Sequence, residues 1–284
     1  VGASGTGIQE VTSLITRLGG GISHAIGIGG RDLALEIGGI SAMKALELLE
    51  YDDSSELIVF ISKPPAKEVK EKIVSKFKTM NKIVVALFLG DGQMEREDNV
   101  YFANTLEETA YLSLYLSKKF GSSKNNLEKI LGKLEIIKKN PNQRQIHGYY
   151  GGGTLAGESK NILKEGMLNS KHKIIDFGDD QYTKGRPHPM IDPTTRVEAV
   201  KNLKRLEDVA VVLLDNVIGY GSNTDMAGSL GPAIMEVNEY YKDSGREIVF
   251  LASVCGTEMD KQVYSQQVRI LEESGVLVLD SNAS

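Results

Sequence analysis

One long loop of the sequence gathers side chains that can bind an anion and move a proton. It follows a strand-like run and carries three prolines within seven residues, which stiffen it. Its chemically competent side chains are Lys184, Arg186, His188, Asp192 and Arg196. The basic groups can hold an anion, and the histidine can transfer a proton near neutral pH. We predict His188, Arg186 and Asp192 as catalytic and Arg196 as an anion ligand; the alternative is a solvated loop in which Asp192 only caps the next helix.

Two glycine-rich turns, Gly2-Ala-Ser-Gly-Thr-Gly7 and Gly151-Gly-Gly-Thr154, each open a helical pattern. A helix N-terminus offers free N–H groups and partial positive charge, which attract phosphate or carboxylate. The predicted ligands here are Ser4, Gly5, Thr6, Gly7, Gly153 and Thr154. The alternative is that the glycines make tight turns and the hydroxyls cap the helices. Neither turn has the spacing of a Walker P-loop or of a Rossmann GxGxxG motif.

Further candidate ligands follow other strand-like runs. The carboxyl ends of parallel strands line the crevice where open α/β sheets bind ligands. The predicted phosphate or substrate ligands at these ends are Arg31, Lys63, Gly219, Gly221, Ser222 and Asn223. For Arg31 the alternative is a surface pair with Asp32. No HExxH motif or Cys/His cluster is present in the sequence, so we predict no tightly held metal.

Short β-branched runs alternate with amphipathic stretches along the chain, which favours an α/β fold with parallel sheets. The predicted strands are 24–28, 57–62, 82–89, 145–150, 173–177, 208–215, 247–253 and 276–279. The predicted helices are 8–18, 40–50, 66–79, 105–118, 155–169, 194–206, 229–243 and 261–273.

Five matched segments in one order indicate that the chain contains the same unit twice. HAIGIGGR aligns with KIIDFGDD, for example, and LIVFISK with VVLLDNV. We therefore predict two tandem flavodoxin-like, doubly wound domains at 1–118 and 145–284. The Lys- and Asn-rich stretch 119–144 is predicted as a linker with one short helix at 126–138. The first copy lacks its first strand and the second its last helix, so we expect a longer natural chain.

Composition excludes several classes of protein. The 284 residues are 41% hydrophobic and 25% charged, which is typical of a globular chain. A net charge of −5 argues against a nonspecific nucleic-acid binder, and no apolar run approaches the ~20 residues that span a bilayer. The single cysteine, Cys255, suits a reducing cytoplasm, so we predict a cytoplasmic protein without nucleic-acid or membrane partners.

Several longer segments of the sequence are distinctive: GASGTGIQE, IGIGGRDL, VFISKPPA, GGGTLAGES, DFGDDQYTKGRPHPMIDPTTR and SVCGTEMDKQ. Together they resemble the FdrA family of acyl-CoA synthetase-like proteins. The resemblance covers the whole chain and implies a relationship to the ligase domains of both succinyl-CoA synthetase subunits. In the synthetases two helix N-termini hold a phosphohistidine, and the matching positions here are Ser4–Gly7 and Gly219–Asn223. The phosphorylated histidine has no counterpart, because Asp91-Gly-Gln-Met-Glu-Arg-Glu-Asp98 stands in its place.

The resemblance implies an acyl- or carbamoyltransferase subunit, as in an oxamate carbamoyltransferase of allantoin breakdown. The implied ligands are carbamoyl phosphate, oxamate or an acyl-CoA, and the implied partners are other subunits. Two alternatives stay open: a CoA ligase of the succinyl-CoA synthetase type and a non-catalytic scaffold that binds an anion. CoA in an upstream region and Mg²⁺ with the phosphate substrate are the implied cofactors, and neither is assigned to these 284 residues themselves.

Overall fold

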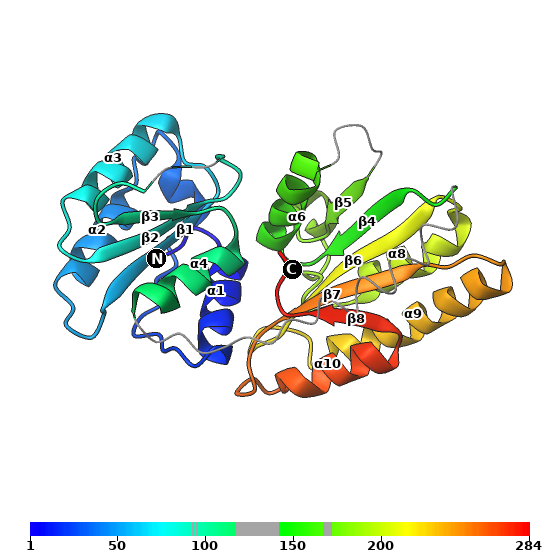
Figure 1. Cartoon of the computed structure of the whole chain (residues 1–284). Helices are drawn as coiled ribbons and strands as arrows, with labels where there is room; N and C mark the ends of the chain where they lie inside the picture. The colour runs from blue at the N-terminus through cyan, green and yellow to red at the C-terminus, as the bar shows by residue number, and fades with distance from the viewer. Residues whose placement is uncertain (93, 95, 118–141, 167–171) are drawn as a thin grey trace. The chain divides into compact units, whose positions relative to one another are not determined.

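The structure, a computed structural model, divides the chain into two compact units, Val1–Ser123 and Lys124–Asn282 (Figure 1). It describes residues 1–92, 94, 96–117, 142–166 and 172–284. The predicted linker at 119–144 and its helix lie almost wholly outside the described residues. None of the helices in the described ranges has both the length and the apolar character needed to cross a bilayer.

The first unit is a parallel sheet covered by helices on both faces. Its elements are α1 (Gly5–Arg17), η1 (Gly30–Leu33), α2 (Ile40–Glu50), β1 (Leu57–Ser62), α3 (Lys67–Lys78), β2 (Ile83–Phe88), β3 (Val100–Ala103) and α4 (Leu106–Leu116). The strands pair in the order β1-β2-β3. Gly2 adds parallel bridges to Ile61 of β1 and to Gly27, so the backbone order is that of a flavodoxin-like sheet.

Two details of the first unit differ from the sequence-based expectation. The predicted strand at 24–28 is reduced to the single bridge at Gly27, because its only strand-like neighbour is the short segment around Gly2. β3 is missing from the strands predicted above, since its sequence, Val-Tyr-Phe-Ala, contains a single β-branched residue.

The core of the first unit fills the space between the sheet and α2 and α3. Ile58 and Phe60 of β1 pack there with Ile73 and Phe77 of α3. The rings of Phe60 and Phe77 meet edge to face with centroids 5.3 Å apart, a favourable aromatic geometry. α1 packs against α4, and both contact β1, on the opposite face of the sheet.

Asp32 caps α2 from inside the protein. Its carboxylate is 5% exposed and accepts hydrogen bonds from the backbone N–H groups of Ser41 (2.8 Å) and Ala42 (2.9 Å). The expected surface pair between Arg31 and Asp32 is therefore absent, because the carboxylate serves the helix instead.

We expect Asp32→Ala to lower the free energy of unfolding by about 1–2 kcal/mol, since it leaves two N–H groups at the start of α2 without their acceptor. Asp53→Ala, at an exposed position, is the matched control and is expected to change stability by less than about 0.5 kcal/mol. Urea unfolding of both variants measures the difference; equal midpoints would contradict the capping role.

The second unit repeats the architecture with a complete five-stranded sheet. Its elements are β4 (Gln145–Tyr150), α6 (Gly153–Gly166), β5 (Lys173–Asp176), α7 (Asp180–Thr183), α8 (Thr194–Asn202), η2 (Leu203–Arg205), β6 (Val209–Val217), α9 (Met226–Asp243), β7 (Val249–Cys255), α10 (Tyr264–Glu273) and β8 (Val276–Leu279). All strands are parallel, in the order β5-β4-β6-β7-β8. Two parallel-sheet α/β domains confirm the predicted fold class.

Helices cover the second sheet unequally. α8, α9 and α10 share one large core with the sheet, to which Val200, Ile234 and Leu271 contribute (Figure 1). α6 packs on the other face, where the hydroxyls of Tyr150 and Ser159 lie 2.8 Å apart. Burial raises the pKa of Tyr150 well above its usual range, so this phenol stays neutral.

Candidate functional site

An internal carboxylate occupies the N-terminal end of α6. Asp215 of β6 is fully buried and accepts hydrogen bonds from the N–H groups of Gly151 (2.8 Å) and Gly152 (2.7 Å). These two residues form the glycine-rich turn just before α6. A helix N-terminus attracts negative charge, and here the protein supplies that charge itself.

Arg196 pairs with this carboxylate in the interior. Its Nη2 lies 2.9 Å from Asp215 Oδ1 and donates to the carbonyl oxygens of Tyr149 (3.1 Å) and Asp215 (2.5 Å). The Arg196 side chain is 1% exposed, and burial lowers its pKa, an effect that Asp215 opposes. The prediction of Arg196 as an anion ligand is thereby corrected, because its guanidinium holds β4, β6 and α8 together.

A second carboxylate, that of Asp176 at the end of β5, lies beside the same turn. Its Oδ1 accepts a hydrogen bond from the N–H of Gly178 at 2.8 Å. A Cβ on Gly153 would lie 2.5 Å from Asp176 Oδ2, so only glycine permits this approach. The predicted anion site at Gly153 and Thr154 is corrected for the same reason: acidic side chains already fill this end of α6.

His188 lies next to Asp176 in the long loop. A Cβ on Gly178 would lie 2.7 Å from His188 Nε2 and 3.0 Å from Asp176 Oδ1, so both side chains border the same glycine. His188 Nδ1 accepts a hydrogen bond from the N–H of Met190 at 3.3 Å, which leaves Nε2 on the side of the carboxylate. The His188 side chain is partly exposed, and its catalytic role stays a prediction.

The other charged side chains of this loop are either exposed or hydrogen-bonded within the protein. Lys184 and Arg186 are exposed, as the prediction of anion ligands requires. Asp192 accepts hydrogen bonds from the Thr194 hydroxyl (2.6 Å) and backbone N–H (3.0 Å) at the start of α8. The Thr194 hydroxyl holds the pKa of Asp192 below its usual range. This geometry corrects the catalytic assignment of Asp192 in favour of the capping alternative.

The turn at 219–223 lies against the same loop. Asn223 donates from its backbone N–H to the carbonyl of Met190 (2.6 Å) and from its side chain to that of Ile191 (2.9 Å). Gln262 donates to the carbonyls of Gly219 and Asn223, both at 2.9 Å. The side-chain amide of Asn223 is therefore already hydrogen-bonded to the loop. Of the ligands predicted in this turn, Gly221 and Ser222 are left on the outer side.

α9, which follows this turn, also has an acidic N-terminus. Asp225 is its N-cap and accepts from the N–H of Gly228 at 2.9 Å and from the side-chain amide of Gln267 at 2.9 Å. The Gln267 side-chain oxygen accepts from the N–H of Ala227 at 3.0 Å. The expected phosphate site at the start of α9 is therefore weakened, because a carboxylate and an amide occupy its N–H groups.

The first unit presents the opposite situation at α1. Ser4 caps the helix by accepting from the N–H of Gly7 at 3.2 Å. Neither the N–H of Gly5 nor that of Thr6 has a hydrogen-bond acceptor within the described residues. Ile61 and Gly27 stand where the second unit has Asp215 and Asp176, so the two aspartates that fill the start of α6 have uncharged counterparts here.

Two exposed cations flank the open end of α1. Arg31 follows the segment that bridges Gly2 on one side, and Lys63 follows β1 on the other. In the described part of the chain neither side chain forms an ion pair or hydrogen bond. Ser62, the last residue of β1, is 1% exposed, and its hydroxyl has no hydrogen-bond partner among the described residues. Gly5, Thr6, Arg31 and Lys63 thus follow three neighbouring segments of one parallel sheet and are the candidates for binding an anion at its edge.

Sequence reasoning missed Asp176 and Asp215, the two carboxylates that distinguish the units. Each aspartate sits at the end of an otherwise apolar strand, and its counterpart in the first copy is Gly27 or Ile61. When the two copies are aligned and the charges of matched residues are compared, these two aspartates stand out because their counterparts are uncharged.

Comparison with known protein families found one match in each unit. Residues 149–284 match the CoA-ligase family model, and residues 1–90 match the CoA binding domain model. The first unit is therefore similar to a CoA binding domain and the second to a CoA-ligase domain. For the first unit this match differs from the predicted ligase-like assignment, which stays a prediction.

The chain is also 37% identical over 309 residues to the uncharacterized protein YahF of Escherichia coli strain K12. The alignment covers 100% of the chain and 59% of YahF, so the chain spans somewhat more than half of that protein.

Proposed function

We propose that the chain is an acyl-CoA synthetase-like subunit that handles an acyl phosphate and binds the phosphate at the N-terminus of α1. The observation that supports this is the contrast between three helix ends. Carboxylates occupy the starts of α6 and α9, whereas at the start of α1 the N–H groups of Gly5 and Thr6 have no acceptor among the described residues. Arg31 and Lys63 add positive charge on both sides of it. Backbone N–H groups combined with an arginine fork suit the oxygens of a phosphate.

The proposed reaction is carbamoyl transfer from carbamoyl-oxamate to phosphate. A phosphate oxygen attacks the carbamoyl carbon, and the bond from that carbon to the oxamate nitrogen breaks. The nitrogen takes up the proton that the phosphate loses, so the products are carbamoyl phosphate and oxamate. Fixed N–H groups and cations orient the phosphate and stabilise its charge without rearrangement.

Arg31→Ala is expected to weaken the binding of inorganic phosphate about tenfold or more, because a charge-assisted hydrogen bond contributes roughly 1.5–3 kcal/mol. Lys63→Ala acts in the same direction with a smaller effect, since ammonium binds phosphate without the bidentate geometry. Lys44→Ala, which removes an exposed lysine of α2, is the control and should bind phosphate like the unchanged chain. Isothermal titration calorimetry measures all three; equal affinities would remove the proposed phosphate site.

A second candidate function is a CoA ligase of the succinyl-CoA synthetase type, which the two family matches favour. A phosphohistidine relay is disfavoured, because the segment after β2 has Asp91, which pairs with Lys70, where the histidine would be expected. The two functions separate in an assay of the protein with its partner subunits. Phosphate-dependent formation of oxamate without CoA supports carbamoyl transfer. Nucleotide turnover that requires CoA, without that reaction, supports the ligase.

A non-catalytic scaffold is the third candidate. It predicts that Arg186→Ala and His188→Ala leave the turnover of the assembled complex unchanged, because neither side chain then takes part in a reaction. A catalytic role for His188 instead predicts a lower turnover for His188→Ala, with a changed pH profile, because an imidazole can carry a proton near neutral pH.

A further inference from the structure

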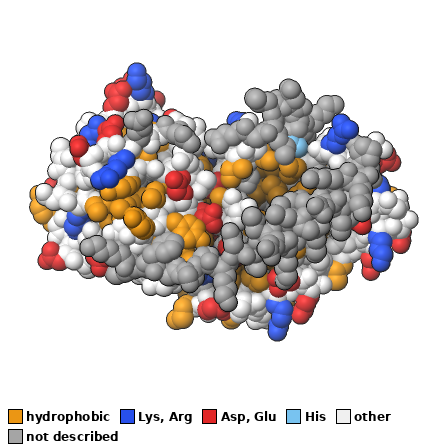
Figure 2. All heavy atoms as spheres, in the orientation of Figure 1, with side chains coloured by type: hydrophobic (Ala, Val, Ile, Leu, Met, Phe, Trp, Pro, Cys, Tyr) orange, Lys and Arg blue, Asp and Glu red, His pale blue; other side chains and the backbone are white. Residues whose placement is uncertain are grey.

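An apolar surface lies on the outer side of α2, one of the two helices that cover the same face of the sheet in the first unit. It consists of Ile40, Leu48 and Tyr51, which are 68%, 58% and 82% exposed, and the exposed Leu35 and Ile37 of the preceding turn extend it. Figure 2 shows apolar side chains at the outer, left-hand edge of the first unit, the edge at which α2 lies in Figure 1. Single exposed apolar side chains are normal, whereas a group of them on one surface marks a site of interaction.

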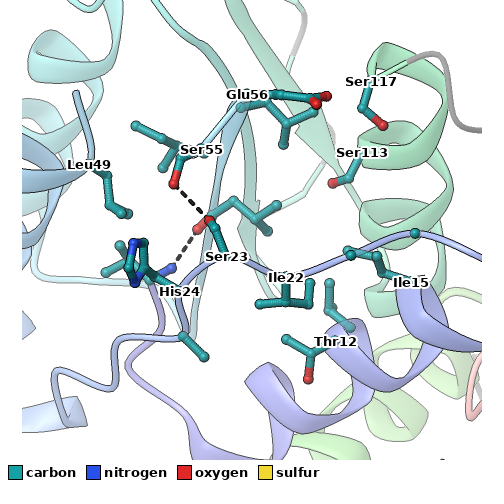
Figure 3. Close-up of a pocket in the computed structure, with 18 of the residues that line it drawn as sticks. Thr12, Ile15, Ile22, Ser23, His24, Leu49, Ser55, Glu56, Ser113 and Ser117 are labelled. Carbon is teal, nitrogen blue, oxygen red and sulfur yellow. Dashed lines mark hydrogen bonds between the residues drawn. The ribbon is translucent and has the colours of Figure 1, made fainter. Parts of the chain in front are cut away.

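Hydrogen bonds fix α2 at both ends. Its start is capped from inside the protein, as described above. At its end, the ammonium of Lys82 donates to the carbonyl oxygens of Leu49 (2.6 Å) and Asp52 (2.5 Å). The hydroxyl of Ser55, which donates to the Asp52 carboxylate, lies 2.8 Å from that of Ser23 (Figure 3). A surface held this rigidly loses little conformational entropy when a partner binds to it.

The exposed positions of α2 have the spacing of a paired helix. Ile40, Lys44, Glu47 and Tyr51, the residue that directly follows the helix, are separated by four, three and four positions. Residues at this spacing lie along one stripe of a helix. The same alternation of four and three is the a/d repeat of a coiled coil, in which the stripe faces a neighbouring helix. Here the two ends of the stripe are apolar, and its middle carries one exposed positive and one exposed negative charge.

This stripe is complementary to a second copy of itself. When two such helices pair antiparallel, with a two-fold axis between positions 45 and 46, Ile40 of one copy faces Tyr51 of the other, and Lys44 faces Glu47. The two-fold axis repeats each contact, so the pair contains two apolar contacts and two ion pairs. A parallel pair would instead place lysine against lysine and glutamate against glutamate, and like charges at an interface repel. The charges of the stripe therefore select the antiparallel arrangement.

We propose that the outer side of α2 is a dimer interface, through which two copies of this chain pair antiparallel about a two-fold axis. Leu48, beside the stripe, adds apolar area, and the methylene groups of Lys44 can cover it. One helix of 11 residues and the turn before it form a small interface, and small interfaces are usually weak. We therefore expect a dissociation constant on the order of 10 µM. A different protein is the competing occupant, and it would leave the isolated chain monomeric.

Sedimentation velocity of the chain from about 1 to 300 µM, a range around the expected dissociation constant, tests the pairing. We expect the fraction of dimer to rise with concentration. Ile40→Ser and Tyr51→Ser should each weaken the dimer at least about tenfold, because each removes an apolar contact that the two-fold axis repeats. Tyr115→Ser, which removes an exposed tyrosine of α4, is the matched control and should leave the dimer unchanged. A chain that stays monomeric over the whole range overturns the proposal, and so does a dimer that neither variant of α2 weakens.

Two charge reversals test the antiparallel register. Lys44→Glu and Glu47→Lys each place like charges opposite one another in a dimer of identical chains, so each variant alone should dimerise at least about tenfold more weakly. An equimolar mixture of the two should regain the affinity of the unchanged chain, because both ion pairs between the chains then join opposite charges. Within each helix the ion pair of Lys44 with Glu47 is lost in both variants, so only contact between chains explains the recovery.

Melting temperatures confirm that both charge variants are folded, and the substitutions leave the proposed phosphate site unchanged. Recovery of the dimer in the mixture supports the proposal. A mixture that associates as weakly as the single variants overturns it, because the opposite charges then do not meet. Single variants that dimerise as tightly as the unchanged chain also overturn it, since α2 is then not the interface.

Discussion

Replacement of Arg196 by methionine will lower the free energy of unfolding by about 3–5 kcal/mol, the usual cost of leaving one partner of a buried ion pair alone. The guanidinium is 1% exposed and its partner Asp215 fully buried, so water cannot take over the lost contacts. Methionine keeps most of the volume, so the loss reports on charge and hydrogen bonds rather than on a cavity. Urea unfolding followed by circular dichroism measures it.

Two further variants test whether the loss of stability comes from the ion pair or from a general disturbance of the second unit. Arg205→Met changes an exposed arginine of η2 and is expected to cost less than about 0.5 kcal/mol. Arg196→Met combined with Asp215→Asn should regain at least about 1 kcal/mol over the single variant, because the amide keeps an acceptor for the turn without a buried charge. A double variant no more stable than Arg196→Met would show that charge is not what the pair contributes.

Gly27→Asp will abolish most of the phosphate binding of the first unit. It places a carboxylate where the second unit has Asp176, beside the start of the helix. A Cβ on Gly27 meets no atom within 4 Å, so the fold accepts the change. Like charges this close cost several kcal/mol, so we expect at least a tenfold weaker affinity for inorganic phosphate.

Gly27→Asn is the matched control, because asparagine has the shape of aspartate without its charge. It should bind phosphate within about threefold of the unchanged chain, a difference of about 0.65 kcal/mol. Calorimetric titration of both variants, with melting temperatures to confirm folding, gives the comparison. Equal weakening by aspartate and asparagine would mean that shape, and not charge, controls this end of α1.

The amino-acid sequence determined the fold class, the internal duplication and nearly all helices. Alternating apolar runs, such as those of β1 and β6, and glycine-rich turns before α1 and α6 are local features, and local features suffice to predict elements. The resemblance in sequence also led to the CoA-ligase class that the family matches support. The prediction of a strand at 24–28 was wrong, because a strand forms only where a neighbouring strand pairs with it, and a local sequence pattern does not reveal that neighbour.

Only the tertiary structure decided which charged residues remain open to a ligand. By sequence Arg31 and Arg196 are alike, two arginines in predicted strand-end loops. Yet Arg31 is exposed, with no ion pair in the part of the chain that the structure describes, while Arg196 is buried against Asp215. Likewise two similar glycine-rich turns differ because Asp176 and Asp215 fill one and Gly27 and Ile61 leave the other open. Pairing depends on residues far apart in the chain that packing brings within 3 Å, so composition and spacing alone could not predict it.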